Sequence, residues 1–272
     1  MHMQIQSGEY PYLYPIGAAQ EKCRERYPGF RILLRIPRLI FPNKDTYTLC
    51  YAYFRWFDDV VDSVRLYPEE SKFVIERQKK FLSQLYAQES PEELATEELF
   101  LAHLVRFDKT QRKNIRRDLG SLICCLEFDA DRRGRIISTR ELEQYVERNI
   151  ISYINISSAI LNVMDSLKQD LIDISKAGFI IDYLFDLRED MALGYINIPL
   201  EDIERYEIDL HALDSHEMQI WMRDKMETLR GALFDTQAFR NLPHLARLLA
   251  ESMAWRRRRK FREIENNNYT LF

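Results

Sequence analysis

Proline, glycine and turn residues divide the chain into helix-length segments, and this pattern limits the folds that it can adopt. Between the breaks, apolar residues recur at the 3.6-residue spacing of an amphipathic helix, and no stretch shows a convincing strand pattern. Glycine occurs only 8 times in 272 residues, below the roughly 7% usual in soluble proteins. We therefore predict an all-α protein with helices over residues 16–26, 44–66, 69–88, 92–106, 109–131, 139–165, 167–192, 215–239 and 244–266.

The domain organisation and location follow from what the sequence lacks. No linker or repeat divides it, so residues 1–272 are expected to form a single domain, and 46% apolar residues are enough for its core. Residues 1–14 show no basic region followed by an apolar run, and no apolar stretch reaches the about 18 residues of a membrane span. We expect a cytoplasmic protein, which an apolar substrate could bring transiently to a membrane surface.

The charge balance argues against a nucleic-acid partner. With 39 basic and 43 acidic residues the net charge is −4. Proteins whose main function is to bind nucleic acid are usually basic. Arg256 to Lys260 is a run of five basic residues. We expect a solvated helix end there, with nucleic acid, anionic lipid or the mouth of an active site as alternatives.

Several cofactor classes have no visible support. The five histidines form no ligand-spaced group and no Glu-x-x-His occurs, which disfavours zinc and di-iron sites. No GxGxxG motif follows a strand-like run, so no NADPH site is evident. The four cysteines show no CxxC spacing and are expected to be reduced thiols.

Two acid clusters stand out against this background. The first consists of Asp58, Asp59 and Asp62, and the second consists of Asp182, Asp186, Glu189 and Asp190. Within each predicted helix the i,i+4 spacing places carboxylates on one face. Such neighbours repel each other unless a cation lies between them. Magnesium is the simplest candidate, because it takes one or two protein carboxylates and completes its shell with water and phosphate oxygens.

The residues around these clusters resemble the motifs of the squalene/phytoene synthase family, of which the chain would be a divergent member. Tyr51-Ala-Tyr-Phe-Arg55-Trp-Phe-Asp58-Asp59-Val-Val-Asp62 is similar to the family's first aspartate-rich motif. Asp186-Leu-Arg-Glu-Asp190-Met-Ala-Leu-Gly194 through Pro199 is similar to its second, usually NxxRDxxEDxxxGRxYxP. Asp129, Leu142 and Tyr145 resemble the pattern between them. The likeness is clearest over residues 30–200.

The resemblance implies an all-α, isoprenoid synthase-like bundle with a central cavity. It also implies Mg²⁺-dependent ionisation of a prenyl diphosphate, such as farnesyl or geranylgeranyl diphosphate (C15 or C20), with two or three magnesium ions. Asp58, Asp62, Asp186 and Asp190 would be the metal carboxylates. Arg55 and Tyr51 would join them in catalysis, with a surface ion pair as the alternative for Arg55. Further substrate-binding candidates are Phe54, Asp59, Asp182, Glu189, Arg35 and Tyr145.

Departures from the family pattern leave the overall reaction open. Asp182 and Phe185 stand where the second motif usually has Asn and Arg, and Gly194-Tyr195 replaces the usual Gly-Arg, so diphosphate-binding cations are missing there. One of Arg31, Arg35 and Arg38 could compensate for the missing Arg at Phe185. Larger residues, Asn149 to Ile154, replace a run that usually contains two glycines. Head-to-head condensation of two prenyl diphosphates is favoured slightly over cyclisation or transfer to another acceptor. A catalytically silent binding module is the alternative from a different class.

Overall fold

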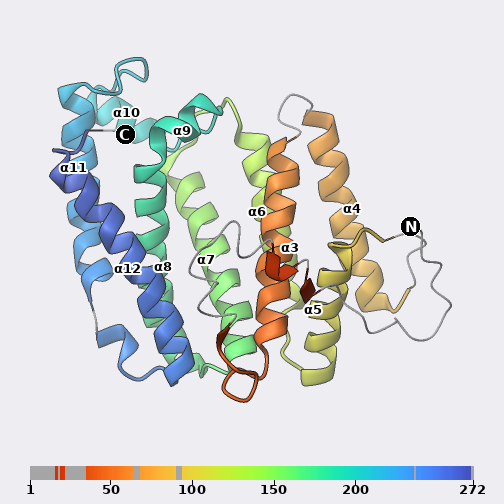
Figure 1. Ribbon diagram of the computed structural model, residues 1–272. Coiled ribbons are helices and arrows are strands. Elements are labelled where there is room, and N and C mark those ends of the chain that lie inside the picture. The colour runs from red at the N-terminus through yellow and green to blue at the C-terminus, as the bar shows by residue number, and fades with distance from the viewer. Residues whose placement is uncertain are drawn as a thin grey trace. The chain divides into compact units, whose positions relative to one another are not determined.

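The computed structural model describes residues 16–17, 19–21, 35–63, 68–89, 94–235 and 237–270, without the side chains at positions 62, 63, 68, 69, 170 and 238. Within these ranges every regular element is a helix and no residue is in a strand (Figure 1). The all-α prediction is therefore confirmed. Of the first predicted helix, residues 18 and 22–26 lie outside the described residues, as does Arg31.

The chain forms two compact units. The first comprises residues 1–130 and 159–161, and the second comprises residues 131–158 and 162–272. The expectation of a single domain over 1–272 remains a prediction. In the part of the chain that the structure describes, no helix is both long enough and apolar enough to cross a bilayer.

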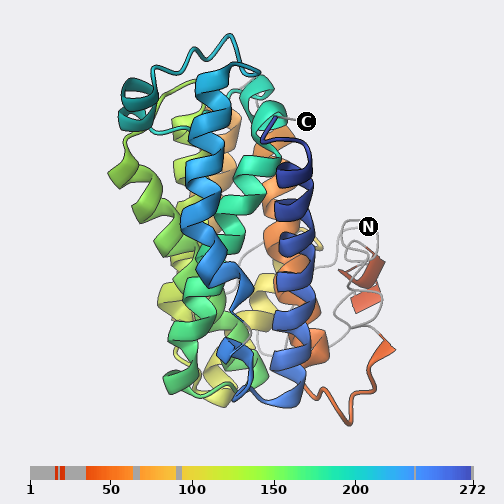
Figure 2. The same cartoon turned by 90° about the vertical axis from the view of Figure 1, so that its left-hand side faces the viewer.

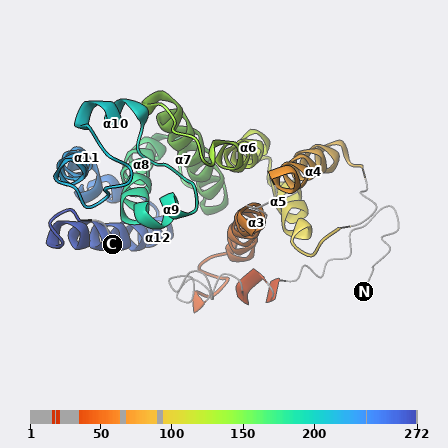
Figure 3. The same ribbon diagram turned by 90° about the horizontal axis from the view of Figure 1, so that it is seen from above.

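The first unit is built on α3, which packs against both α4 and α5. Its helices are α3 (Lys44–Ser63), α4 (Pro68–Ala87), α5 (Glu98–Gln111) and most of α6 (Arg116–Arg132). Figure 3 shows α3, α4 and α5 grouped together. Leu49, Tyr53 and Phe57 recur every four residues along α3 and are each at most 1% exposed, as expected for one buried helix face. The acid cluster follows directly at the end of the same helix.

The boundary between α5 and α6 lies later in the sequence than predicted. The predicted break fell between residues 106 and 109, whereas α5 continues to Gln111 and α6 begins at Arg116. Arg112 ends α5 in a left-handed conformation with φ of 51°, and its N–H donates to the carbonyl of Asp108. The Asp108 carboxylate also accepts a hydrogen bond from Ile115 N–H at 3.1 Å. No proline or glycine marks this turn, which explains the error.

The second unit is centred on α8, which packs against both α11 and α12 (Figure 2). Its core includes Ile181, Trp221, Met226 and Phe261, all at most 1% exposed. The elements are α7 (Thr139–Leu161, whose last three residues belong to the first unit), η1 (Asp165–Leu167), α8 (Lys168–Phe185), α9 (Leu187–Ala192), α10 (Leu200–Tyr206), α11 (His216–Phe234), η2 (Gln237–Phe239) and α12 (His244–Asn266).

The start of α7 agrees with the sequence prediction because a local signal fixes it. Ser138 and Glu141 form a capping box, in which the Ser138 hydroxyl accepts the Glu141 N–H and the Glu141 carboxylate accepts the Ser138 N–H. This exchange satisfies two helix donors that would otherwise lack partners.

The predicted helix over 167–192 is two helices, which corrects the sequence analysis. Asp186 has φ of −93° and ψ of 7°, so it ends α8 and precedes α9. Leu184 and Leu187, on either side of this bend, are both buried in the core of the second unit. No proline or glycine precedes the bend, and tertiary packing of this kind is not visible in the sequence. The short helix α10 was also missed.

Helices α8 and α12 approach each other closely at Gly178. A β-carbon on Gly178 would overlap Cδ of the Arg257 side chain, which crosses α8 at this point. The absence of a side chain at Gly178 therefore lets Arg257 pass over α8 toward Asp182.

Candidate active site

The first acid cluster lies in the last turns of α3, where one arginine contacts two of its members. Arg55 Nη1 lies 3.1 Å from Asp58 Oδ2, and Arg55 Nη2 lies 2.7 Å from Asp59 Oδ1. These residues are i,i+3 and i,i+4 neighbours, so the helix itself brings them together. The ion pair considered as the alternative for Arg55 is therefore present in the structure, and both carboxylates remain partly exposed.

The charge on Arg55 is favoured by its surroundings. Burial lowers the pKa of the guanidinium, but Asp58, Asp59 and Tyr51 raise it by more, so the net pKa lies above its ordinary value. Its Nε is buried and has no hydrogen-bond partner among the described residues. A buried donor without a partner costs free energy, and Arg55 therefore keeps one N–H for which a bound acceptor would be favourable.

The remaining first-motif candidates have varied environments. Asp62 belongs to α3, but its side chain is outside the described set. Tyr51 and Phe54 are half-buried, and the Phe54 ring meets the Tyr53 ring edge-on with centroids 5.0 Å apart. Upstream, Arg35 is exposed, and Arg38 forms a 2.5 Å ion pair with Asp45.

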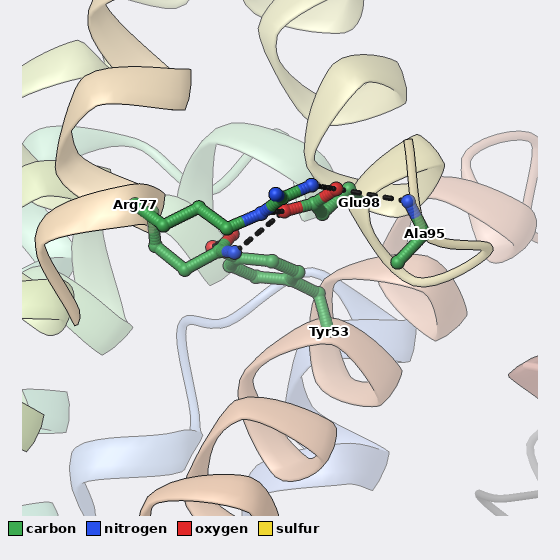
Figure 4. Close-up of polar contacts among 5 residues, drawn as sticks. Tyr53, Arg77, Ala95 and Glu98 are labelled. Atoms are coloured by element: carbon green, nitrogen blue, oxygen red, sulfur yellow. Dashed lines mark hydrogen bonds and ion pairs between the residues drawn. The ribbon is translucent and has the colours of Figure 1, made fainter. Parts of the chain in front are cut away.

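A buried polar network fixes α3 against α4 and α5 (Figure 4). The Tyr53 hydroxyl donates to Gln78 Oε1 at 2.9 Å, and Gln78 Nε2 donates to Glu98 Oε1 at 2.8 Å. Arg77 donates to both oxygens of Glu98, and Ala95 N–H donates to Oε2. Because Tyr53 lies just over one turn before Asp58, this network helps to fix the rotation of the helix that carries the first acid cluster.

The second acid cluster is partly neutralised by basic residues of α12. Lys260 Nζ lies 3.1 Å from Asp182 Oδ1 and 3.1 Å from Asp186 Oδ2. Arg257 Nε lies 3.1 Å from Asp182 Oδ2. The basic run from Arg256 to Lys260 therefore does more than form a solvated helix end, because two of its members reach back to α8. The structure thus supplies countercharges that the sequence analysis did not assign to this cluster.

Asp186 keeps a perturbed ionisation despite this contact. Burial raises the pKa of its carboxyl, Lys260 lowers it, and the nearby charges of Asp182 and Glu189 raise it again. The net pKa lies above the ordinary value. The ionised carboxylate would therefore gain from additional positive charge.

Asp190 is held by residues that the sequence analysis did not select. Asn197 Nδ2 donates to Asp190 Oδ2 at 2.7 Å, and Arg132 Nη1 donates to Asn197 Oδ1 at 2.8 Å. Arg132 is 3% exposed and its guanidinium lies over the rings of Tyr145 and Tyr195, at 5.5 and 5.2 Å. This chain of contacts orients the Asp190 carboxylate. Asn197 lies within the second motif but was not selected as a site residue, and Arg132 belongs to no motif.

The second-motif candidate Glu189 lies at the surface, and Tyr145, from the pattern between the two motifs, lies in an aromatic group. Glu189 is exposed. Tyr145 is 7% exposed, and its ring is nearly parallel to that of Tyr183, with an interplanar angle of 9° and centroids 6.5 Å apart. Phe179 contacts both rings. Tyr145 is therefore part of an aromatic cluster on α7 and α8.

Neither acid cluster, taken by itself, forms a group of three metal ligands among the residues that can be examined. Across the described residues, no three His, Cys, Asp or Glu side chains converge on a point that could hold a metal ion. Asp62 is not part of that comparison, because its side chain is not described.

Comparison with known proteins assigns this arrangement to a class of isoprenoid enzymes. The family model described as squalene/phytoene synthase matches residues 42–272. The chain belongs to the squalene/phytoene synthase family, and it is a prenyltransferase that acts on isoprenyl diphosphates. A search of the curated proteins found no match.

Solved structures show the same fold at low sequence identity. A squalene synthase HpnC from Alicyclobacillus acidocaldarius matches with a TM-score of 0.77 and 15% identity, covering 94% of this chain and 95% of that one. A dehydrosqualene synthase crystallised in complex with a ligand matches with a TM-score of 0.74 and 16% identity, covering 94% of this chain and 88% of that one. The predicted all-α isoprenoid synthase fold is confirmed.

Proposed function

We propose that the chain ionises an allylic prenyl diphosphate in a Mg²⁺-dependent reaction and releases inorganic diphosphate, with head-to-head condensation of two prenyl diphosphates as the overall reaction. The observation that carries the proposal is the family match over residues 42–272 together with acidic residues at both motif positions. Farnesyl or geranylgeranyl diphosphate is the proposed substrate.

The carboxylates fit magnesium by their chemistry and their exposure. The side chains of Asp58 and Asp186 are 37% and 42% exposed, so a hydrated ion can reach both. Magnesium takes only one or two protein carboxylates, so a group of three is not required. We assign the metal role to Asp58 and Asp62 in the first unit and to Asp186 and Asp190 in the second. Two or three bound ions would supply positive charge to the departing diphosphate.

Basic and aromatic side chains would assist the ionisation. Arg55 is fixed by Asp58 and Asp59 and keeps a buried N–H without a partner in the described residues, which a diphosphate oxygen could accept. The aromatic cluster of Tyr145, Phe179 and Tyr183 would offer ring faces to an allylic cation and exclude water. Further proposed contacts to substrate are Tyr51, Phe54, Asp59, Asp182, Glu189 and Arg35.

A second reaction on the same fold is supported by a specific observation. Ile150, Ser152 and Ile154, in the segment where the family usually has a run with two glycines, are at most 5% exposed and occupy interior space. Phe185 also replaces the usual cation of the second motif. Both features favour an enzyme that binds one diphosphate and cyclises the chain or transfers it to another acceptor.

Product analysis separates these reactions. We would incubate the purified chain with geranyl, farnesyl or geranylgeranyl diphosphate and Mg²⁺, then measure diphosphate release and identify products by mass spectrometry. Condensation gives a product of doubled carbon number, whereas cyclisation leaves the carbon number unchanged. No release from any substrate would favour the catalytically silent module.

Two substitutions test the site itself. Asp58→Asn and Asp186→Asn should each lower diphosphate release by about a hundredfold, as expected when a group that stabilises transition-state charge is removed. Asp131→Asn removes an exposed carboxylate of α6 and serves as the matched control. Turnover retained by both site variants would contradict the assignment.

A further inference from the structure

The Lys260 ammonium lies in a site formed by three side chains of α8 and its C-terminal bend. It is 3.1 Å from Asp182 Oδ1, 3.1 Å from Asp186 Oδ2 and 4.7 Å from the centroid of the Phe185 ring. The two carboxylates supply opposite charge, and the ring supplies its electron-rich face. Only 29% of the lysine side chain is exposed. An ammonium held by two carboxylates and a ring is more constrained than one in a surface ion pair.

Two of the residues that differ from the usual family motif contact this lysine. Asp182 replaces the usual Asn and adds a carboxylate, and Phe185 replaces the usual Arg and adds a ring. A cation at position 185 would repel the Lys260 ammonium, whereas Phe185 attracts it. Both departures therefore favour a cation that comes from α12.

Two further features hold α12 in place for this contact. Arg257 lies one turn before Lys260 and binds the other oxygen of Asp182 at 3.1 Å, with only 16% of its side chain exposed. Gly178 leaves the space through which Arg257 crosses α8. Arg257 and Lys260 of α12 thus lie where α8 offers opposite charge and where Gly178 leaves space.

We propose that Lys260 is a tethered cation that competes with divalent cations for the second acid cluster. Its ammonium lies between Asp182 and Asp186 and contacts one of the two carboxylate oxygens of Asp186. A divalent ion bound at Asp186 would therefore be repelled by the Lys260 ammonium and would compete with it for the same carboxylate. The inference deepens the proposed function, because it concerns the same carboxylates.

The experiment measures Mn²⁺ binding to the full chain without any prenyl substrate. Mn²⁺ serves as the probe because the paramagnetic resonance signal of the free ion reports binding directly. All variants carry Asp58→Asn so that the first acid cluster contributes less. The quantity of interest is the part of Mn²⁺ binding that disappears when Asp186→Asn is added.

We expect Lys260→Met to increase Asp186-dependent affinity for Mn²⁺ by about tenfold, which corresponds to about 1.4 kcal/mol. Lys260→Gln should act in the same direction and provides a second variant if the methionine variant does not fold. Lys260→Arg, which keeps the charge, should show a smaller gain than either. Lys176→Met is the control for the overall change in charge. It removes a cation that lies on α8 and pairs with Glu147 at 3.0 Å.

The proposal is wrong if folded Lys260→Met or Lys260→Gln binds Mn²⁺ no more tightly than the parent, or if the gain survives Asp186→Asn. It is also wrong if Lys176→Met produces the same gain. Because no turnover is measured, this result is separate from the proposed function. A chain that releases no diphosphate can still show the Lys260 effect, and an active enzyme can lack it.

Discussion

Glu98 and Arg77 form two parallel hydrogen bonds, at 2.7 Å from Nε and 2.8 Å from Nη2, although only the arginine has substantial solvent access. The Glu98 side chain is 1% exposed and that of Arg77 is 47% exposed. The buried carboxylate is thus satisfied entirely by protein donors. This arrangement ties α4 to α5 next to the helix that carries the first acid cluster.

Removing this carboxylate should destabilise the first unit strongly. Glu98→Ala leaves Gln78 and the Ala95 N–H without their acceptor, and we expect a loss of about 3 kcal/mol in the free energy of unfolding. Urea unfolding followed by circular dichroism measures it. Glu76→Ala, which breaks an exposed pair with Lys79 on the same helix, should cost less than about 1 kcal/mol. Equal losses in the two variants would show that the network is not important for stability.

The pKa of Glu98 predicts the direction in which the free energy of unfolding changes with pH. Burial raises the pKa of Glu98, but hydrogen bonds from Arg77, Ala95 and Gln78 lower it by more, so the folded-state pKa lies below the ordinary 4.5. Such a group stabilises the fold above its unfolded pKa, and this stability is lost as the pH falls through the folded pKa.

The stability advantage of the native chain over Glu98→Gln should therefore be complete near neutral pH and should shrink as the pH falls below about 4.5. Unfolding free energies of both proteins, measured across this range, provide the check. An advantage that grows toward low pH would contradict the direction given for this pKa.

Asn197 should influence metal dependence, provided that the proposed function holds. Asn197→Leu removes the hydrogen bond that orients Asp190, and loss of such a partner typically weakens metal affinity about tenfold or more. The concentration of Mg²⁺ at half-maximal diphosphate release should rise accordingly. Asn241→Leu, at an exposed turn, is the control. An unchanged Mg²⁺ requirement would remove Asn197 from the site.

Two helical glycines should respond to alanine in opposite directions. Gly231 in α11 has open space around it, so Gly231→Ala should stabilise the chain by about 0.5 kcal/mol through helix propensity. Gly178→Ala must displace Arg257, and we expect a net loss of about 1–3 kcal/mol from overpacking. Thermal unfolding of both variants tests this pair. Stabilisation by Gly178→Ala would mean that Arg257 moves aside without cost.

Local signals in the sequence were sufficient for most of the helices and for the family. Proline, glycine and the Ser138 cap define several helix ends, and the i,i+4 acids mark the first cluster on α3 and the second at the junction of α8 and α9. The motif resemblance led to the family that the comparison then showed over residues 42–272. These features depend on residues that are close together in the chain, which is why they could be predicted.

The parts that were missed depend on contacts between distant residues. Lys260 is 74 residues from Asp186, and Arg132 is 65 residues from Asn197. The bend at Asp186 follows from the burial of Leu187 in a core that forms only in three dimensions. The sequence indicated that opposed acids need a cation, but it did not show that α12 supplies one.

Because the chain bends at Asp186, the neighbouring carboxylates of Asp182 and Asp190 lie on different helices, and different parts of the chain set their orientations. Asp182 belongs to the long, buried helix α8, whereas Asp190 belongs to the six-residue α9 and is oriented by Asn197 in the turn that follows. Mutations in that turn can therefore redirect Asp190 while Asp182 keeps its orientation. Substitutions that arise in evolution or in protein engineering can therefore change the orientation of the carboxylate at one end of the cluster without changing the other.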